Sequence, residues 1–206
     1  LDVDNEAIDF GKENYPTANW IHHKAFNNVY QTEGNIEQPF PFADSTFDII
    51  CAYSVYSHTT FKQFIYDLFE ALRICKPGGS IAFTLVDEIS AEWFVDKRKM
   101  DYEGSNKPAL SYETLCKKDI QDYIYFVNND LLIDEINNVS SLDYLVTVYN
   151  LKWVSSFLNK LNITHKIKFP PQQHIQRTLV IKRGDEDVGA LKQLYETNKN
   201  LVDILF

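Results

Sequence analysis

The 206-residue sequence has little of what marks a membrane, secreted or nucleic-acid-binding protein. No run approaches the ~18 apolar residues that cross a bilayer, and no charged-then-apolar signal segment opens it. The three cysteines lack CxxC spacing, so we expect reduced thiols in a cytoplasmic protein, with Cys51 and Cys75 packed as small hydrophobes. The 29 acidic against 20 basic residues give a net charge of −9, which argues against nucleic acid as a partner.

Glycine is scarce where a nucleotide-binding fold would need it. The seven glycines include no GxG sequence, which disfavours an oxidoreductase that holds a dinucleotide with a GxGxxG turn. Clusters with the spacing of metal ligands are lacking too. His22 and His23 are adjacent, so on a strand they point to opposite faces and cannot together chelate one ion. We therefore expect no metal centre.

The sequence does contain ample apolar material for a core, since hydrophobic residues make up 45% of it. Asp4 can cap a helix over residues 5–14, and residues 20–26 have the composition of a strand. Residues 47–53 form a short apolar run of the type found in buried parallel strands. The first quarter of the chain therefore reads as alternating helix and strand.

A longer helix follows this strand. Thr60 and Gln63 fit a capping box at its start, and an i, i+3, i+4, i+7 apolar stripe behind them needs a sheet to pack against. The Lys-Pro-Gly-Gly sequence at 76–79 stops the helix, and residues 80–86 are apolar again. A strand, a helix and a second strand in this order predict a βαβ unit and an α/β fold.

Residues 87–147 lack this rhythm and are predicted to be a mostly helical insertion. The rhythm returns with a helical pattern over 151–161, an alternating strand over 163–169 and a last strand over 178–182. The tail 184–206 is amphipathic and predicts a helical extension.

Three segments in order resemble the middle of class I S-adenosylmethionine-dependent methyltransferases: PFADSTFDII at 41–50, SVYSH at 54–58 and LRICKPGG at 72–79. The resemblance implies a Rossmann-like, mostly parallel sheet with helices on both faces and an antiparallel C-terminal edge strand pair. It places the methyltransferase domain at 1–183, with the insertion 87–147 over the acceptor site. It also implies S-adenosylmethionine as cofactor.

Residues 1–4 resemble the family's second strand, so the first strand and its glycine-rich turn are missing from this chain. The first strand lies centrally in that fold, and without it two sheet edges face each other unpaired. We expect upstream residues, or another segment or chain, to supply a strand there. A further domain upstream or downstream is compatible with this expectation.

The resemblance assigns the cofactor's ribose to the carboxylate at the end of the second strand. Asp2, followed by Val3, occupies this place, and a carboxylate can accept hydrogen bonds from both ribose hydroxyls. Asp4 is expected to cap the following helix instead. The alternative is that Asp2 and Asp4 are both ordinary loop carboxylates without a role in binding or capping.

The remaining candidates also follow from the resemblance. Asn27 and Asn28 stand where the family often has an acidic residue beside adenine, or they merely serve a turn. Tyr53 and Ser54 lie beside the methionine part of the cofactor. His58 is a candidate general base, or else a residue that orders the turn before the helix.

The predicted function is methyl transfer from S-adenosylmethionine to an O, N or C nucleophile of an unknown acceptor, with a glycan or a small molecule as candidates. Such a reaction depends mainly on alignment of donor and acceptor, so the sequence indicates the cofactor better than the substrate. The alternative is a non-catalytic relative that keeps the fold as a scaffold or partner-binding domain.

Overall fold

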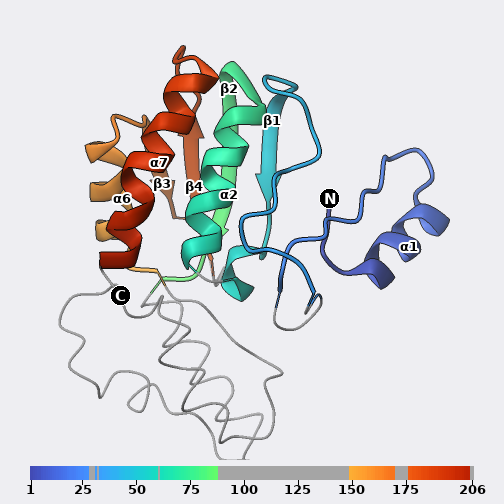
Figure 1. Cartoon of the computed structure of the whole chain (residues 1–206). Coiled ribbons are helices and arrows are strands. Elements are labelled where there is room, and N and C mark those ends of the chain that lie inside the picture. Colours follow the sequence, from blue (N-terminus) through green and yellow to red (C-terminus); the bar gives the residue numbers. More distant parts are fainter. Residues whose placement is uncertain (28–30, 32, 60, 88–148, 170–175, 205–206) are drawn as a thin grey trace, which may run out of the picture.

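A computed structural model of the chain describes residues 1–27, 31, 33–59, 61–87, 149–169 and 176–204 (Figure 1). The predicted insertion 87–147 lies, apart from Asp87, outside the described residues. The elements in chain order are α1 (Asn5–Asn14), β1 (Phe47–Ala52), the short 3-10 helix η1 (Tyr56–His58), α2 (Phe61–Ile74), β2 (Cys75–Leu85), α6 (Leu151–Lys160), β3 (His165–Lys168), β4 (Arg177–Lys182) and α7 (Val188–Ile204).

The four described strands form one sheet in the order β1-β2-β4-β3. β1 and β2 are parallel and are joined through α2, so the predicted βαβ unit is confirmed. β4 pairs antiparallel with both β2 and β3, which confirms the antiparallel strand pair at the C-terminal edge. The fold is therefore α/β with a mixed sheet, in which one of the three described pairings is parallel.

β2 begins earlier than the sequence predicts. The helix α2 ends at Ile74, and β2 starts at once with Cys75, so the Lys-Pro-Gly-Gly sequence lies inside the strand's bounds rather than before them. The register against β1 shifts between the Phe47–Cys75 and Ile49–Ser80 pairs, which marks an irregularity at these residues. Gly78 has a φ of 75° there, a conformation that glycine adopts without steric cost. The Lys-Pro-Gly-Gly sequence therefore causes an irregularity inside β2 and does not separate the helix from the strand.

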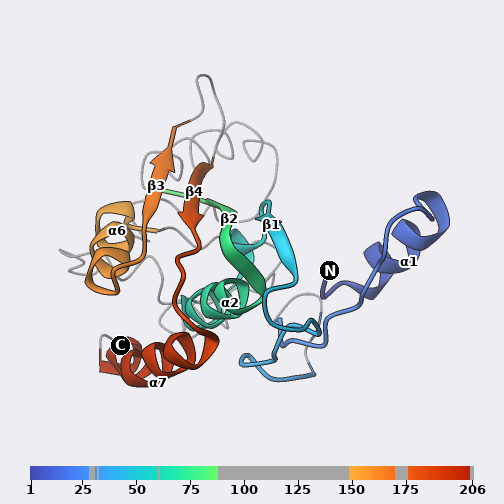
Figure 2. The same ribbon diagram turned by 90° about the horizontal axis from the view of Figure 1, so that it is seen from above.

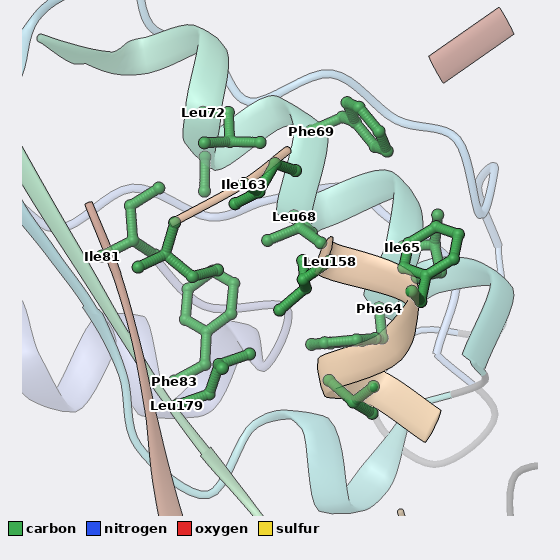
Figure 3. Close-up of a cluster of buried hydrophobic side chains, with 14 of the residues drawn as sticks. Phe64, Ile65, Leu68, Phe69, Leu72, Ile81, Phe83, Leu158, Ile163 and Leu179 are labelled. Carbon is green, nitrogen blue, oxygen red and sulfur yellow. The ribbon is translucent and has the colours of Figure 1, made fainter. Parts of the chain in front are cut away.

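The core lies on one face of the sheet, between the strands and the helices α2, α6 and α7. Figure 3 shows the apolar stripe of α2, with Phe64, Leu68 and Leu72, pointing at side chains of the sheet and of α6. All these side chains are nearly or fully buried. The stripe predicted for this helix is thus confirmed, and its burial provides most of the reason why 61–74 is helical.

The C-terminal tail closes this layer. α7 packs against α2, where the Tyr195 ring lies 5.4 Å from Phe69 and 5.6 Å from Tyr66 between ring centroids. Leu191 is also buried in the core cluster. The tail is therefore helical, as predicted, and docks on the domain.

The opposite face of β1 is not covered by any described helix. Ile49 is 68% exposed and Tyr53 is 77% exposed, and Cys51, which lies between them on the same face, is exposed as well. The prediction that Cys51 packs as a small hydrophobe is therefore wrong, because its side chain points to this open face. Cys75, at the start of β2, is fully buried as predicted.

The N-terminal segment stands apart from the sheet together with α1, as Figure 2 shows. Residues 20–26 do not form the predicted strand; they make single bridges, among them a parallel one between Asp2 and His22. The described residues place no strand between this segment and β1, so the segment has no ladder to extend. The chain thus lacks a described first strand of the fold, in accordance with the sequence.

Candidate functional site

A cavity of about 1140 Å³ lies between the N-terminal segment and the free edge of β1. Its walls come from residues 1–27, the loop before β1, β1 with the turn after it, and one side of α2. Small-molecule sites usually measure roughly 300–1,000 Å³. The cavity therefore exceeds the room for one ligand, as expected if a strand along the free edge of β1 also belongs there.

Asp2 reaches this cavity from an extended segment whose backbone is fixed. Its N–H donates to the Ile21 carbonyl at 3.2 Å, and its carbonyl accepts from the His23 N–H at 2.7 Å. The exposed side chain accepts the Asp4 N–H at Oδ1, at 3.0 Å, whereas Oδ2 makes no hydrogen bond among the described residues. A carboxylate with a free oxygen, on an anchored backbone, can accept hydrogen bonds from a ligand's hydroxyl groups.

Asp4 has a different task. It is the N-cap of α1, and its Oδ1 accepts the N–H groups of Glu6 at 2.9 Å and Ala7 at 3.3 Å. These amides have no partner inside the helix, so the carboxylate replaces the missing carbonyls. The prediction that Asp4 caps the helix is confirmed.

Val3 and Asn27 both line the cavity. The Val3 carbonyl accepts a hydrogen bond from Nε2 of His22 at 3.1 Å. Asn27 is 5% exposed, and its backbone exchanges both hydrogen bonds with Gln31, so it serves a turn and faces the cavity at once. Asn28 lies outside the described residues.

The opposite end of the cavity is formed by Tyr53 and Ser54, directly after β1. Ser54 has a φ of 59°, a left-handed conformation that costs a residue other than glycine on the order of 1–3 kcal/mol. Its N–H donates to Oγ1 of Thr84 at 2.7 Å, and its carbonyl accepts from Oγ of Ser57 at 3.2 Å. Held strain of this kind at the carboxyl end of a strand is typical of ligand sites.

His58 is the last residue of η1, which follows this turn. The role of His58 as a base stays a prediction. A hydrogen bond from the core also holds this turn, because the hydroxyl of buried Tyr149 donates to the Tyr56 carbonyl at 3.0 Å. Burial raises the pKa of the Tyr56 hydroxyl well above its ordinary value.

Sequence reasoning missed two buried polar groups in the cavity wall, Asp67 of α2 and His23. Their atoms Asp67 Oδ1 and His23 Nε2 have no hydrogen-bond partner among the described residues. Burial, together with nearby Glu70, raises the pKa of Asp67 well above its ordinary value. Burial lowers the pKa of His23, although Glu70 opposes this shift.

The sequence contains one indication that Asp67 shares a site with another polar residue. Asp67 lies four residues after Gln63, beside the apolar stripe of α2, so the two polar side chains share one flank of the helix. Both of them line the cavity and are buried. Nothing local distinguishes such a pair from an ordinary solvated flank.

Two negative findings bound the chemistry of the described part of the chain. It contains no group of three or more His, Cys, Asp or Glu side chains that could hold a metal ion. None of its helices combines the length and the apolar character needed to span a membrane.

Comparison with known proteins finds a sequence family that matches the part of the chain lining this cavity. Residues 1–83 match the sequence model of a family described as a methyltransferase domain. The match includes the segments that contribute Asp2, Asn27 and Ser54.

Among solved structures, the chain is similar to an S-adenosylmethionine-dependent methyltransferase from Methanosarcina mazei, at 14% identity and a TM-score of 0.49 over 90% of this chain and 81% of that one. It is also similar to the S-adenosylmethionine-dependent methyltransferase SibL, at 14% identity and a TM-score of 0.45 over 89% of this chain and 42% of SibL. A protein from Pyrococcus horikoshii OT3 gives 14% identity and a TM-score of 0.46 over 88% and 68%.

Proposed function

We propose that the chain is part of a class I S-adenosylmethionine-dependent methyltransferase and that it transfers the methyl group of this cofactor to an O, N or C nucleophile of an acceptor. The match of residues 1–83 to the methyltransferase-domain family supports this proposal. The observation that carries the proposal is the cavity between Asp2 and the carboxyl end of β1. A crevice at this end of an open α/β sheet is where such folds bind nucleotide ligands. We propose residues 1–183 as the domain and 184–206 as its extension.

The residues present fit the cofactor. The free Oδ2 of Asp2 would accept from the ribose hydroxyls, and buried Asn27 would contact the adenine with its amide. Tyr53 and Ser54 would line the methionine end. These four residues come from both sides of one cavity, although up to 52 positions separate them in the sequence.

When bound, S-adenosylmethionine supplies a methyl group activated by its sulfonium. The chain's own residues then have to hold the acceptor nucleophile in line with that methyl, at ~3–3.5 Å. Tyr53, largely exposed beside the strained Ser54 turn, would form the wall on which an acceptor rests. His58, next to this turn, would take a proton from a hydroxyl or amine nucleophile, or would only order the turn.

The acceptor is proposed to be a glycan or a small molecule, and the protein to act in the cytoplasm. The net charge of −9 supports a ligand other than nucleic acid. A scaffold that binds no cofactor is the alternative, and the binding experiment separates the two.

The test is calorimetric titration of the folded protein with S-adenosylhomocysteine and S-adenosylmethionine. We expect micromolar dissociation constants, about −8 kcal/mol. Asp2→Ala should weaken binding by roughly 1.5–3 kcal/mol, since it removes charge-assisted hydrogen bonds to the ribose. Asp9→Ala, an exposed carboxylate on α1 paired with Lys12, is the matched control and should leave affinity unchanged. Folded wild-type protein that gives neither heat nor a thermal shift with either ligand would favour the scaffold.

A further inference from the structure

Ser54 has a hydrogen-bond partner at its N–H, at its carbonyl and at its side-chain oxygen. Besides the bonds of its N–H and carbonyl described above, its Oγ accepts a hydrogen bond from Nε2 of Gln176 at 2.8 Å. Gln176 comes from the far side of the sheet, 122 positions later in the chain. It stands directly before β4, so the segment that leads into this antiparallel strand contacts the turn after β1.

The placement of Gln176 is itself fixed. The next residue, Arg177, pairs with Leu85 in the sheet, and its Nε donates to Oδ2 of Asp87 at 2.9 Å in a largely buried ion pair. The Arg177 guanidinium also lies 5.1 Å from the centre of the Phe169 ring. These contacts hold the start of β4 against the end of β2. They fix the backbone next to Gln176 and therefore the position from which its side chain reaches Ser54.

The direction of this hydrogen bond decides what Ser54 can offer. An amide nitrogen only donates, so the Ser54 oxygen is the acceptor, and its own proton is left for another partner. The backbone groups of Ser54 are already bonded to Thr84 and Ser57, and neither contact takes the hydroxyl proton. Because Ser54 lines the cavity, that proton is available to a ligand there.

We propose that Gln176 is a positioning residue that keeps the Ser54 hydroxyl as a hydrogen-bond donor to the carboxylate of the cofactor's methionine portion. This inference rests on the proposed function. Asp2, at the other end of the cavity, is itself a carboxylate, which suits hydroxyl groups and repels the cofactor's carboxylate. A donor such as Ser54 is what the anionic end requires, and the bond is charge-assisted.

The amide of Gln176 has a second feature that fits this role. Its Oε1 is buried and accepts no hydrogen bond among the described residues. The Nε2 contact with Ser54 is therefore the one hydrogen bond that the Gln176 amide makes among the described residues.

The experiment compares two ligands that differ only at this end. S-Adenosylhomocysteine carries the carboxylate, and 5′-methylthioadenosine lacks the whole amino-acid portion. The variants are Ser54→Ala, Gln176→Met, the double variant, and Gln193→Met on the exposed side of α7 as matched control. Calorimetry gives the dissociation constants, and thermal melting confirms that each variant is folded.

We expect Ser54→Ala to weaken S-adenosylhomocysteine about tenfold or more, Gln176→Met to weaken it severalfold, and the double variant to bind no worse than Ser54→Ala. Affinity for methylthioadenosine should change less than about twofold in all of them. Equal weakening of both ligands by Gln176→Met would overturn the proposal, because it would indicate a deformed turn. Additive losses in the double variant, or unchanged S-adenosylhomocysteine affinity, would overturn it as well.

If Gln176→Met does not fold, Gln176→Asn serves in its place, because it keeps the amide but is one methylene too short to reach Ser54. Wild-type protein that binds methylthioadenosine but not S-adenosylhomocysteine contradicts the inference while leaving nucleoside binding intact. Wild-type protein that binds neither ligand contradicts the proposed function instead.

Discussion

Replacement of Asp67 by Asn should stabilise the ligand-free protein at neutral and alkaline pH. Asp67 is 5% exposed, lies in the middle of α2, and its Oδ1 has no partner among the described residues. Because burial raises the pKa of this carboxyl above its ordinary value of 3.8, the folded protein binds the Asp67 proton more tightly than the unfolded chain does. Its contribution to stability is therefore complete below pH 3.8 and is lost as the pH rises through the folded-state pKa.

Asn cannot titrate. The free energy of unfolding of Asp67→Asn should therefore exceed that of the wild type by a larger amount as the pH rises. A buried polar group without a partner costs about 1–3 kcal/mol, and for a domain of this size 1 kcal/mol shifts Tm by about 2–4 °C. We expect Tm to rise by about 2–12 °C at pH 8 and to match the wild type near pH 4. Asp67→Leu, which also removes the unpaired oxygen, should be at least as stable at pH 8.

The assay is thermal unfolding at several pH values, with Asp9→Asn as the control that changes the same charge on an exposed side chain. A pH dependence of Tm that is the same in Asp67→Asn and the wild type would refute the reasoning. A lower Tm of Asp67→Asn at pH 8 would do so too, since it would mean that the carboxylate has a stabilising partner. Repeating the series with S-adenosylhomocysteine shows whether the ligand changes the environment of Asp67.

Two further predictions concern Asp4 and His58. Asp4→Ala should cost ~1 kcal/mol of helix stability, seen as faster hydrogen exchange of the Glu6 and Ala7 amides, with cofactor affinity unchanged; a large loss of affinity instead would exchange the roles of Asp4 and Asp2. His58→Gln should lower the methylation rate at most about tenfold and keep the wild-type pH profile, because positioning alone can carry methyl transfer to a good nucleophile. A flat pH profile with a loss beyond about a hundredfold would identify His58 as the general base.

The elements that the sequence predicted well are those whose stability is local or depends on a neighbour that the chain provides. Helix α1 begins where Asp4 can cap it, and α2 follows an apolar stripe that finds the sheet. β1 and β2 pair with each other across α2. In each case the pattern in the sequence and the packing in space demand the same structure.

The failures have a common physical cause. Residues 20–26 have the composition of a strand but no described strand beside them, and a lone extended segment gains no ladder of hydrogen bonds. Cys51 was expected inside because its strand is apolar, yet burial depends on what covers a face, which β1's own residues do not specify. Asp67 was overlooked since a carboxylate on a helix flank is usually solvated.

The candidate site was predictable only as far as the order of its segments. Asp2 and Ser54 follow extended segments, so their common location could be inferred from the rule that strand ends meet at one edge of the sheet. Gln176 could not be found in this way. Its contact with Ser54 depends on the antiparallel return of β4 beside β2, and the pattern of 178–182 predicts a strand but not its partner.

The free edge of β1 links these observations. Ile49 on β1 and Tyr53 directly after it are exposed, and the cavity runs along this strand. Asp67 Oδ1 and His23 Nε2 face the same cavity and have no hydrogen-bond partner among the described residues. Unpaired edges and unsatisfied buried polar atoms are both costly, and a strand seated along β1 would relieve both at once. Such a strand would also narrow the cavity, whose volume of about 1140 Å³ exceeds that of a usual small-molecule site. Cofactor affinity should therefore depend on how fully this edge is paired, and hydrogen exchange of the β1 amides, measured alongside cofactor binding, reports the pairing directly.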